Sequence, residues 1–163
     1  MSKVFFTSDL HFGHQNLCKC VRNMGAEESD ELIIKNWNKT ITKNDKVYIL
    51  GDITVGNHKT IADYLKQLKG NIVIVGGNHD NLKCCQEITK CGIPIMGVLE
   101  YKGFICTHIP IHPMELERYI GNIHGHLHIA NQEVLPEQYY NVNTEFHNYT
   151  PVLFEDIVKY FTK

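Results

Sequence analysis

The sequence contains 163 residues, of which 43% are hydrophobic and 21% are charged, and its formal net charge at neutral pH is −2. This length predicts a single domain over residues 1–163 with a sizeable buried core. The near balance of charges argues against a protein that grips nucleic acid through a broad basic surface. It does not exclude a phosphate-bearing substrate, because bound metal ions would reverse the local field.

The targeting pattern and the cysteines indicate a cytoplasmic protein without a membrane span. The apolar run before Asp9 is too short for a secretory signal peptide, and no apolar segment is long enough to cross a bilayer. The six cysteines form no C-x-x-C pair, so a structural zinc site is not supported. We therefore expect reduced thiols, with disulfides as the minor alternative.

Apolar strands and amphipathic helices are predicted to alternate through the first 90 residues. The patterns indicate strands over residues 3–8, 46–50 and 71–75 and helices over residues 28–42, 60–68 and 81–90. Ser29 is the predicted N-cap of the first helix, and Gly70 is predicted to end the second.

The second half of the chain is predicted to contain more strands than helices. The expected elements are an antiparallel pair over 94–99 and 104–107 with its turn at 102–103, a helix over 113–119, strands over 122–124, 139–142 and 152–154, and a helix over 155–161. Residues 129–138 are the most loop-like segment. Alternating elements followed by antiparallel strands predict a mixed α/β sandwich.

Polar side chains follow five of the predicted strands. The third strand leads into Gly76-Gly77-Asn78-His79-Asp80, where two glycines allow a tight turn. In open α/β sheets, ligands bind beyond the carboxyl ends of strands, so these side chains lie where chemistry is usually placed. The strand-end groups are Asp9, His11, Asp52, Asn78, His79, His108, His126 and His128.

The chemistry of these groups indicates metal binding. The sequence has 10 histidines, and carboxylate, amide and imidazole groups without thiolates suit Mn²⁺, Fe, Zn²⁺ or Ni²⁺. There are more groups than one tetrahedral site uses, and they fit two divalent ions that share a bridging carboxylate. Two ions about 3.5–4 Å apart can stabilise the attacking and the leaving oxygen of a phosphoryl displacement.

The ordered motifs resemble those of a known family. Asp-x-His, Gly-Asp, Gly-Asn-His-Asp, a lone strand-end His and Gly-His-x-His occur in that order between residues 3 and 128, which resembles the calcineurin-like metallophosphoesterase superfamily. The segment Ser-Asp-Leu-His-Phe-Gly-His-Gln-Asn at residues 8–16 is similar to the small bacterial and bacteriophage branch. The resemblance implies a sandwich of two mixed β-sheets flanked by helices, with the metals at the strand ends.

The resemblance also implies a role for each strand-end group. A first metal would be held by Asp9, His11, Asp52 and His128, and a second by Asp52, Asn78, His108 and His126. Asp52 would bridge the two metals. A bridging water or hydroxide would attack phosphorus, and His79 would contact the phosphate and protonate the leaving oxygen as general acid.

Two departures from the family's larger members bear on the substrate. The Ser/Thr protein phosphatases of the superfamily carry Asp-Arg-Gly soon after Gly-Asp, whereas Gly51-Asp52 is followed here by Ile53-Thr54-Val55. The chain also lacks an inserted cap domain, which predicts an open site. Both features favour a phosphodiester substrate, including cyclic nucleotides or nucleic-acid ends, over a phosphoprotein.

Several nearby residues have alternative explanations. His14 and Arg22 are candidate phosphate contacts, with a solvated surface role as the alternative for both. Asp80 is expected to cap the helix that follows it. His124 is expected to support the ligands or pack, and His112 to lie in a turn.

Three other functions fit the same sequence. A phosphomonoesterase would use the same metals. A protein-interaction scaffold with this fold would have lost catalysis, although the retained His79 argues against that reading. A nuclease would need a DNA-binding partner, because the chain shows no basic surface of its own. The oligomeric state, the native metals and the substrate are not determined by these patterns.

Overall fold

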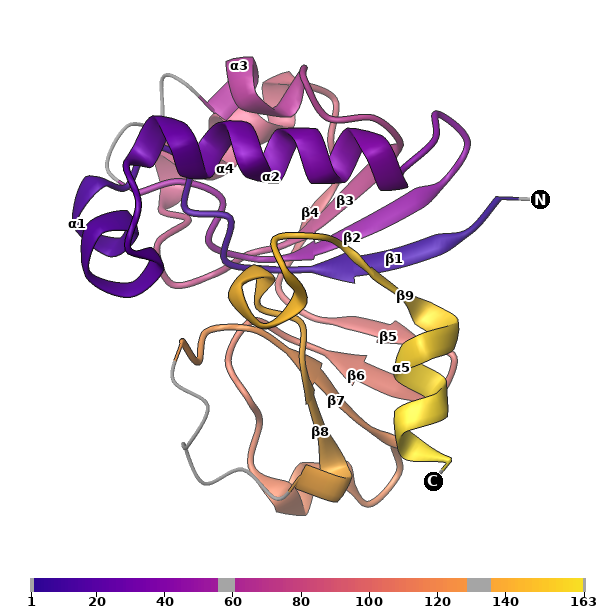
Figure 1. Ribbon diagram of the computed structural model, residues 1–163. Helices are drawn as coiled ribbons and strands as arrows, with labels where there is room; N and C mark the ends of the chain where they lie inside the picture. The colour runs from indigo at the N-terminus through magenta and orange to yellow at the C-terminus, as the bar shows by residue number, and fades with distance from the viewer. Residues whose placement is uncertain (1, 56–60, 129–135, 163) are drawn as a thin grey trace.

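The computed structural model describes residues 2–55, 61–128 and 136–162. Residues 129–135 of the predicted loop and Thr60, the predicted start of the second helix, lie outside these segments. The predicted fold class is confirmed: the chain is α/β, with two mixed β-sheets flanked by helices (Figure 1).

The larger sheet has five strands in the order β4-β3-β2-β1-β9. They are β1 Val4–Thr7, β2 Lys46–Leu50, β3 Asn71–Val75, β4 Ile95–Met96 and β9 Val152–Leu153. Strands β1 to β4 are parallel, whereas β9 pairs antiparallel with β1. The parallel strands therefore end at one common edge, and the loops that leave them start there.

The smaller sheet has four strands in the order β5-β6-β7-β8. They are β5 Leu99–Tyr101, β6 Phe104–Cys106, β7 Gly121–His124 and β8 Tyr139–Asn141. The β5–β6 hairpin is antiparallel, and β6, β7 and β8 are parallel.

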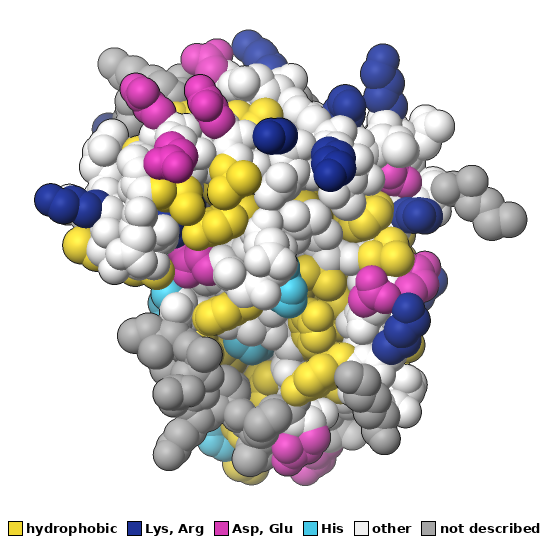
Figure 2. Space-filling model, viewed as in Figure 1, with side chains coloured by type: hydrophobic (Ala, Val, Ile, Leu, Met, Phe, Trp, Pro, Cys, Tyr) yellow, Lys and Arg dark blue, Asp and Glu magenta, His cyan; other side chains and the backbone are white. Residues whose placement is uncertain are grey.

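The helices cover one face and one end of this sandwich (Figure 1). They are α1 Gln15–Leu17, which continues into a π-helical turn Cys18–Arg22, α2 Ala26–Thr40, α3 Ile61–Leu65, α4 Leu82–Lys90 and α5 Phe154–Phe161. Short 3-10 turns form at Pro113–Leu116, Pro136–Gln138 and Thr144–His147. Figure 2 shows both signs of charge scattered over the helical layer on the side drawn there.

Two apolar cores lie on opposite faces of the larger sheet. Alternation along β2 points Val47 and Ile49 toward α2, α3 and α4, and Tyr48 and Leu50 toward the smaller sheet and α5. Burial on both faces explains why these strands read as continuous apolar runs in the sequence.

Two predicted elements differ from the structure. The 94–99 segment does not form one strand: Ile95–Met96 extends the larger sheet beside β3, and only Leu99–Tyr101 pairs with β6. The free edge of β3 explains the split, since its Ile74 amide donates to the carbonyl of Pro94. The helix predicted over 113–119 is a single 3-10 turn, Pro113–Leu116.

The predicted N-cap of the first long helix is also wrong. Helix α2 starts at Ala26 with Gly25 as its N-cap, so Ser29 lies inside the helix. Its buried hydroxyl accepts a hydrogen bond of 2.9 Å from Nη1 of Arg22. Ser29 is therefore one of the acceptors that the buried guanidinium needs, and it does not cap the helix.

The described segments contain neither a membrane-spanning helix nor a disulfide. No helix of the described segments is both long and apolar enough to cross a bilayer. All six cysteines lie in these segments, and each carries a free thiol.

We predict that Trp37→Ala lowers the free energy of unfolding by about 3–5 kcal/mol, because it leaves a large cavity in the core. Trp37 is fully buried between α2 and the larger sheet, and its Nε1 donates a 2.8 Å hydrogen bond to the Lys69 carbonyl. Urea unfolding followed by circular dichroism measures this effect. Met114→Ala, at a side chain that is 74% exposed, is the control, and an equal loss in both variants would contradict the prediction.

Candidate metal centre

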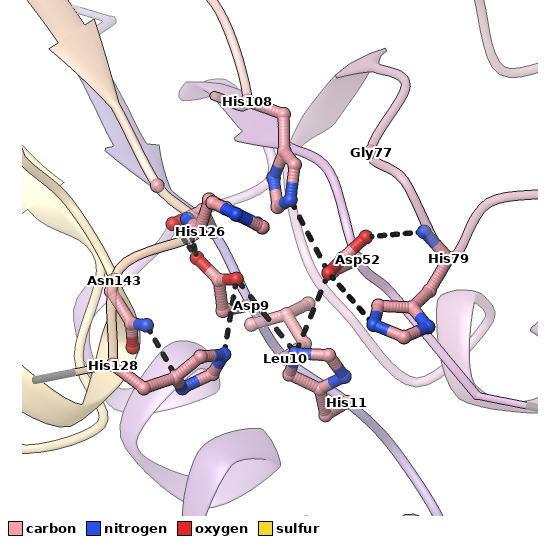
Figure 3. Close-up of polar contacts among 12 residues, drawn as sticks. Asp9, Leu10, His11, Asp52, Gly77, His79, His108, His126, His128 and Asn143 are labelled. Carbon is pink, nitrogen blue, oxygen red and sulfur yellow. Dashed lines mark hydrogen bonds and ion pairs between the residues drawn. The ribbon is translucent and has the colours of Figure 1, made fainter. Parts of the chain in front are cut away.

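The polar strand-end groups converge at the edge where the parallel strands end (Figure 3). Asp9 follows β1, Asp52 follows β2 and His79 follows β3, while His108 and His126 follow β6 and β7 of the other sheet. The parallel direction of each group of strands brings loops that are distant in the sequence to one place.

The first cluster contains Asp9, His11 and His128, whose ligand-type atoms lie within 4.8 Å of one another. Oδ1 of Asp9 is 3.7 Å from Nε2 of His11 and 3.6 Å from Nε2 of His128. The other oxygen, Oδ2, accepts hydrogen bonds from the Ser8 hydroxyl and from the His126 amide at 2.9 Å. The carboxylate is thereby fixed with one oxygen left to face the two imidazoles.

The second cluster contains Asp52, His108 and His126. Nε2 of His108 lies 3.3 Å from Oδ2 of Asp52 and 2.8 Å from Oδ1 of Asn78, so the amide lies beside this cluster. Nδ1 of His108 is 2.7 Å from the Leu50 carbonyl, which directs Nε2 toward the carboxylate.

Oδ2 of Asp52 lies between the clusters. It is 3.3 Å from Nε2 of His108 in the second cluster and 3.6 Å from Nε2 of His11 in the first. Its partner oxygen Oδ1 accepts a 2.9 Å hydrogen bond from the His79 amide. The Asp52 carboxylate is thus held within reach of imidazoles from both clusters.

The donor set fits two metal ions. Oδ1 of Asp9 and both ring nitrogens of His11 are buried without a hydrogen-bond partner among the described residues. Buried polar atoms in native proteins are almost always paired, so such a group needs an explanation, and a bound ion is one. Oxygen and imidazole donors suit divalent transition metals without specifying one. The two clusters are therefore consistent with a dinuclear metal site.

The electrostatics keep both carboxyls ionised. Burial alone would raise the pKa of Asp9, but the nearby imidazole of His11, the charge of His108 and the Ser8 hydrogen bond outweigh it and lower this pKa. Burial also opposes ionisation of Asp52, yet the hydrogen bond and charge of His108 lower its pKa. The pKa of His108 is raised, because the two carboxylates outweigh the effect of its own burial. Ionised carboxylates are the form that binds cations.

Four of the cluster residues have a strained backbone. The φ angles of Asp9, His11, Asp52 and His126 are +57°, +48°, +56° and +69°, in the left-handed region that disfavours side chains. Such conformations cost about 1–3 kcal/mol each and occur most often at functional sites. They persist here because the two loops pair: the Asp9 amide donates to the Gly51 carbonyl and the His11 amide to that of Asp52, both at 3.0 Å.

Two motif glycines allow the backbone to touch the carboxylates. A Cβ atom on Gly77 would overlap Oδ1 of Asp52, and one on Gly125 would overlap the Ser8 hydroxyl and Oδ2 of Asp9. The glycines of Gly-Asn-His-Asp and Gly-His-x-His are therefore required by close packing against the two carboxylates.

Asp80 does not cap the following helix, so that prediction is wrong. Asn81 caps α4, because its side chain accepts from the first amides of that helix. The buried Asp80 carboxylate accepts instead from the amides of Asp52 at 2.8 Å, Gly77 at 2.9 Å and Ile53 at 3.2 Å. It joins the loops after β2 and β3 and holds Asp52 in place.

Glu145, in the 3-10 turn after β8, is a residue that the sequence analysis missed. Its Oε2 lies 2.8 Å from Nδ1 of His128, and its Oε1 accepts a 3.0 Å hydrogen bond from Nε of Arg22. Asn143 also lies beside this ring, with Nδ2 3.2 Å from Nδ1 (Figure 3). These contacts orient Nε2 of His128 toward Asp9. No local motif marks Glu145, since it lies 17 residues beyond the histidine that it contacts.

Arg22 lies behind the first cluster. It is 5% exposed, so the surface role considered from the sequence is not what the structure shows. Its Nη2 donates to the Asp9 carbonyl at 2.7 Å and its Nη1 to the Leu10 carbonyl at 3.0 Å. The guanidinium therefore stabilises the strained loop that carries Asp9, and its contact with phosphate stays a prediction.

His79 and His14 lie at the rim of the site. The His79 side chain is 45% exposed, with Nε2 3.9 Å from Oδ2 of Asp52 (Figure 3). The ring of half-buried His14 lies 5.7 Å from that of His11, and its Nδ1 caps α1 by accepting from the Leu17 amide at 3.3 Å.

The two other histidines considered from the sequence lie outside the clusters. His124 is buried against Tyr139, and burial lowers its pKa to about 4, so its ring is neutral and packs in the core. Exposed His112 caps the 3-10 turn Pro113–Leu116, in agreement with the expected turn role.

A two-sheet α/β sandwich with two adjacent Asp/His clusters at one strand edge defines a metallophosphoesterase-like protein. The family model for calcineurin-like phosphoesterases matches residues 2–159, and the chain belongs to this family. The family consists of metal-dependent phosphoesterases, which implies a phosphate-ester substrate.

Similar proteins include small archaeal and phage relatives. An uncharacterised protein of Methanocaldococcus jannaschii is 35% identical over an alignment of 174 positions. The alignment covers 100% of this chain and 93% of that protein. The gene 66 protein of Mycobacterium phage L5 is 39% identical over 85 residues, which cover 49% of this chain and 41% of the phage protein.

Solved structures share the fold. A protein of unknown function from Aquifex aeolicus has a TM-score of 0.79 and 25% identity, covering 98% of this chain and 99% of that one. The Pseudomonas putida nuclease MPE has a TM-score of 0.51 and 16% identity, covering 76% of this chain and 59% of that one.

We predict that Gly125→Ala weakens Mn²⁺ binding at least about tenfold and destabilises the fold by about 1–3 kcal/mol, because the new methyl group displaces the Asp9 carboxylate. Titration calorimetry and urea unfolding measure the two effects. Gly25→Ala is the matched control, since a Cβ there meets nothing within 4 Å. Wild-type Mn²⁺ affinity in folded Gly125→Ala would contradict the prediction.

We predict that Glu145→Gln weakens Mn²⁺ binding by about 10–100-fold, the range found for groups that orient metal-binding histidines. The substitution keeps the shape of the side chain but removes the charge shared between His128 and buried Arg22. Mn²⁺ titration on protein shown to be folded measures the effect. Glu155→Gln, at an exposed position on α5, is the control, and equal affinities would overturn the role given to Glu145.

Proposed function

We propose that this chain is a dinuclear metal-dependent phosphodiesterase in which His79 is the general acid. The observation that carries the proposal is the position of the Asp52 carboxylate, whose Oδ2 lies 3.3 Å from Nε2 of His108 in its own cluster and 3.6 Å from Nε2 of His11 in the first cluster. A carboxylate shared by two imidazole clusters is suited to bridging two ions.

The proposed ligands follow from the contacts. The first ion would be held by Asp9, His11, Asp52 and His128, and the second by Asp52, Asn78, His108 and His126. When bound, two divalent ions supply Lewis acidity toward the phosphate and lower the pKa of a water molecule. Their native identity is open, and Mn²⁺ is the ion we choose for testing.

His79 is placed to move a proton. Its side chain is 45% exposed among the described residues, and its Nε2 lies 3.9 Å from Oδ2 of Asp52. The backbone amide of the same residue donates to Oδ1 of Asp52, so the loop that carries the ring is held beside the carboxylate. We infer that protonated His79 hydrogen-bonds the phosphate and transfers its proton to the leaving oxygen. His14, at the same rim, is a further proposed phosphate contact.

Two features favour a diester over a phosphoprotein. The chain lacks the Asp-Arg-Gly motif that the family's protein phosphatases carry soon after Gly-Asp. The Pseudomonas putida protein of similar fold is named a nuclease, which makes a phosphodiester the first substrate class to test.

We predict that His79→Ala binds Mn²⁺ normally but loses about 10²–10⁴-fold in turnover, because it removes the proton donor and no metal ligand. The assay is hydrolysis of matched aryl phosphodiester and phosphomonoester substrates with added Mn²⁺, with metal content measured in parallel. Normal turnover in this variant would overturn the proposed mechanism.

We predict that Asp52→Asn loses both ions and all turnover, since a neutral amide is a poor bridge between two cations. Asp156→Asn, on the exposed face of α5, is the matched control. A monoester preference in the wild-type protein would assign a phosphomonoesterase. Absence of turnover on both substrates in metal-loaded protein would favour the scaffold function.

A further inference from the structure

A hollow of about 370 Å³ opens beside the second cluster. Asn78 and His108 form the wall that it shares with the candidate metal centre. The remaining lining residues are Gly76, Gly77, Gly97, Thr107, Ile109 and Ile111. Its volume lies at the lower end of the range of about 300–1,000 Å³ that is usual for small-molecule sites.

The chemistry of the lining selects an uncharged ligand group. Apart from His108, which belongs to the second cluster, the described residues that line the hollow carry no ionisable side chain. The Thr107 hydroxyl is already engaged, since it donates a 2.7 Å hydrogen bond to the Ile109 carbonyl. Three glycines expose flat backbone, and the Ile109 side chain is 49% exposed at the wall. An apolar, planar group would cover this isoleucine without leaving a buried charge unpaired.

The hollow lies next to the residues that we propose to take part in the reaction. Asn78 directly precedes the proposed general acid His79, and its Oδ1 lies 2.8 Å from Nε2 of His108. A phosphate held between the clusters therefore has one of its ester substituents next to this opening. We propose that the hollow binds a neutral, planar organic substituent of the phosphate ester, of aryl or nucleobase size. The proposal rests on the proposed function for the placement of the phosphate.

Gly97 offers a way to fill the hollow without disturbing the metal ligands. A Cβ atom added to Gly97 meets nothing within 4 Å, and its backbone lies outside the left-handed region. Gly97→Leu should therefore occupy the hollow while the protein still folds. Gly25→Leu adds the same side chain where a Cβ also meets nothing within 4 Å but no part of the hollow is present, which makes it the matched control.

The test compares the binding of phenylphosphonate and methylphosphonate to Mn²⁺-loaded protein by titration calorimetry. The two probes share the anionic head group and differ only in the organic substituent. We expect the wild-type protein and Gly25→Leu to bind phenylphosphonate about tenfold more tightly, which corresponds to about 1.4 kcal/mol. Gly97→Leu should bind both probes equally, with unchanged affinity for methylphosphonate.

Equal affinities in the wild-type protein, or a phenyl preference that survives in Gly97→Leu, would overturn the proposal. If Gly97→Leu loses affinity for both probes, the same comparison is made with Ile109→Ser. A reduced preference for phenylphosphonate in Ile109→Ser supports binding of the substituent in the hollow, and an unchanged preference overturns it. The outcome is separable from the proposed function, because a phenyl preference without hydrolysis of any ester would refute the hydrolase and leave the binding site standing.

Discussion

The placement of the Asp52 carboxylate is the constraint on which the rest of the site depends. One oxygen is tied to the His79 amide, and the other faces imidazoles of both clusters. A carboxylate this deeply buried is unfavourable unless cations or hydrogen-bond donors surround it. The surrounding histidines supply part of that compensation for Asp52, and the neighbouring Oδ1 of Asp9, which has no hydrogen-bond partner among the described residues, is consistent with a bound cation at the same site.

The surrounding structure is organised to hold this arrangement at a cost in backbone strain. The loops after β1 and β2 run side by side, and backbone hydrogen bonds from Asp9 and His11 join them. Asp80 fastens the loop after β2 to that after β3 through three amides. The apolar cores on both faces of the larger sheet stabilise the strands that precede these loops. The packing of the sandwich therefore offsets the backbone strain in the loops at the edge of the sheet.

The two sheets meet at the site. The Ser8 amide donates to the Val142 carbonyl at 3.1 Å, and the Thr144 amide donates to the Ser8 carbonyl at 3.2 Å, so the end of β1 is bonded to the segment after β8. This junction brings Glu145 to His128 and to Arg22. These contacts between the sheets thus connect the first cluster to the largely buried Glu145 carboxylate and to the buried Arg22 guanidinium. In the part of the chain that the structure describes, His79 and the hollow beside Asn78 lie exposed on the outer side of the site.

The sequence by itself determined the fold class, most of the strands and the polar groups at their ends, because apolar period and strand-end position are local properties. The groups expected at five strand ends do converge, since parallel strands end at a common edge. Only the tertiary structure assigned Asp80 to the loops rather than to a helix cap, and Ile95–Met96 to the larger sheet. The contact of Glu145 with His128 also depends on it. These features rest on hydrogen bonds between segments far apart in the chain, and no local pattern specifies which free donor or strand edge a residue will meet.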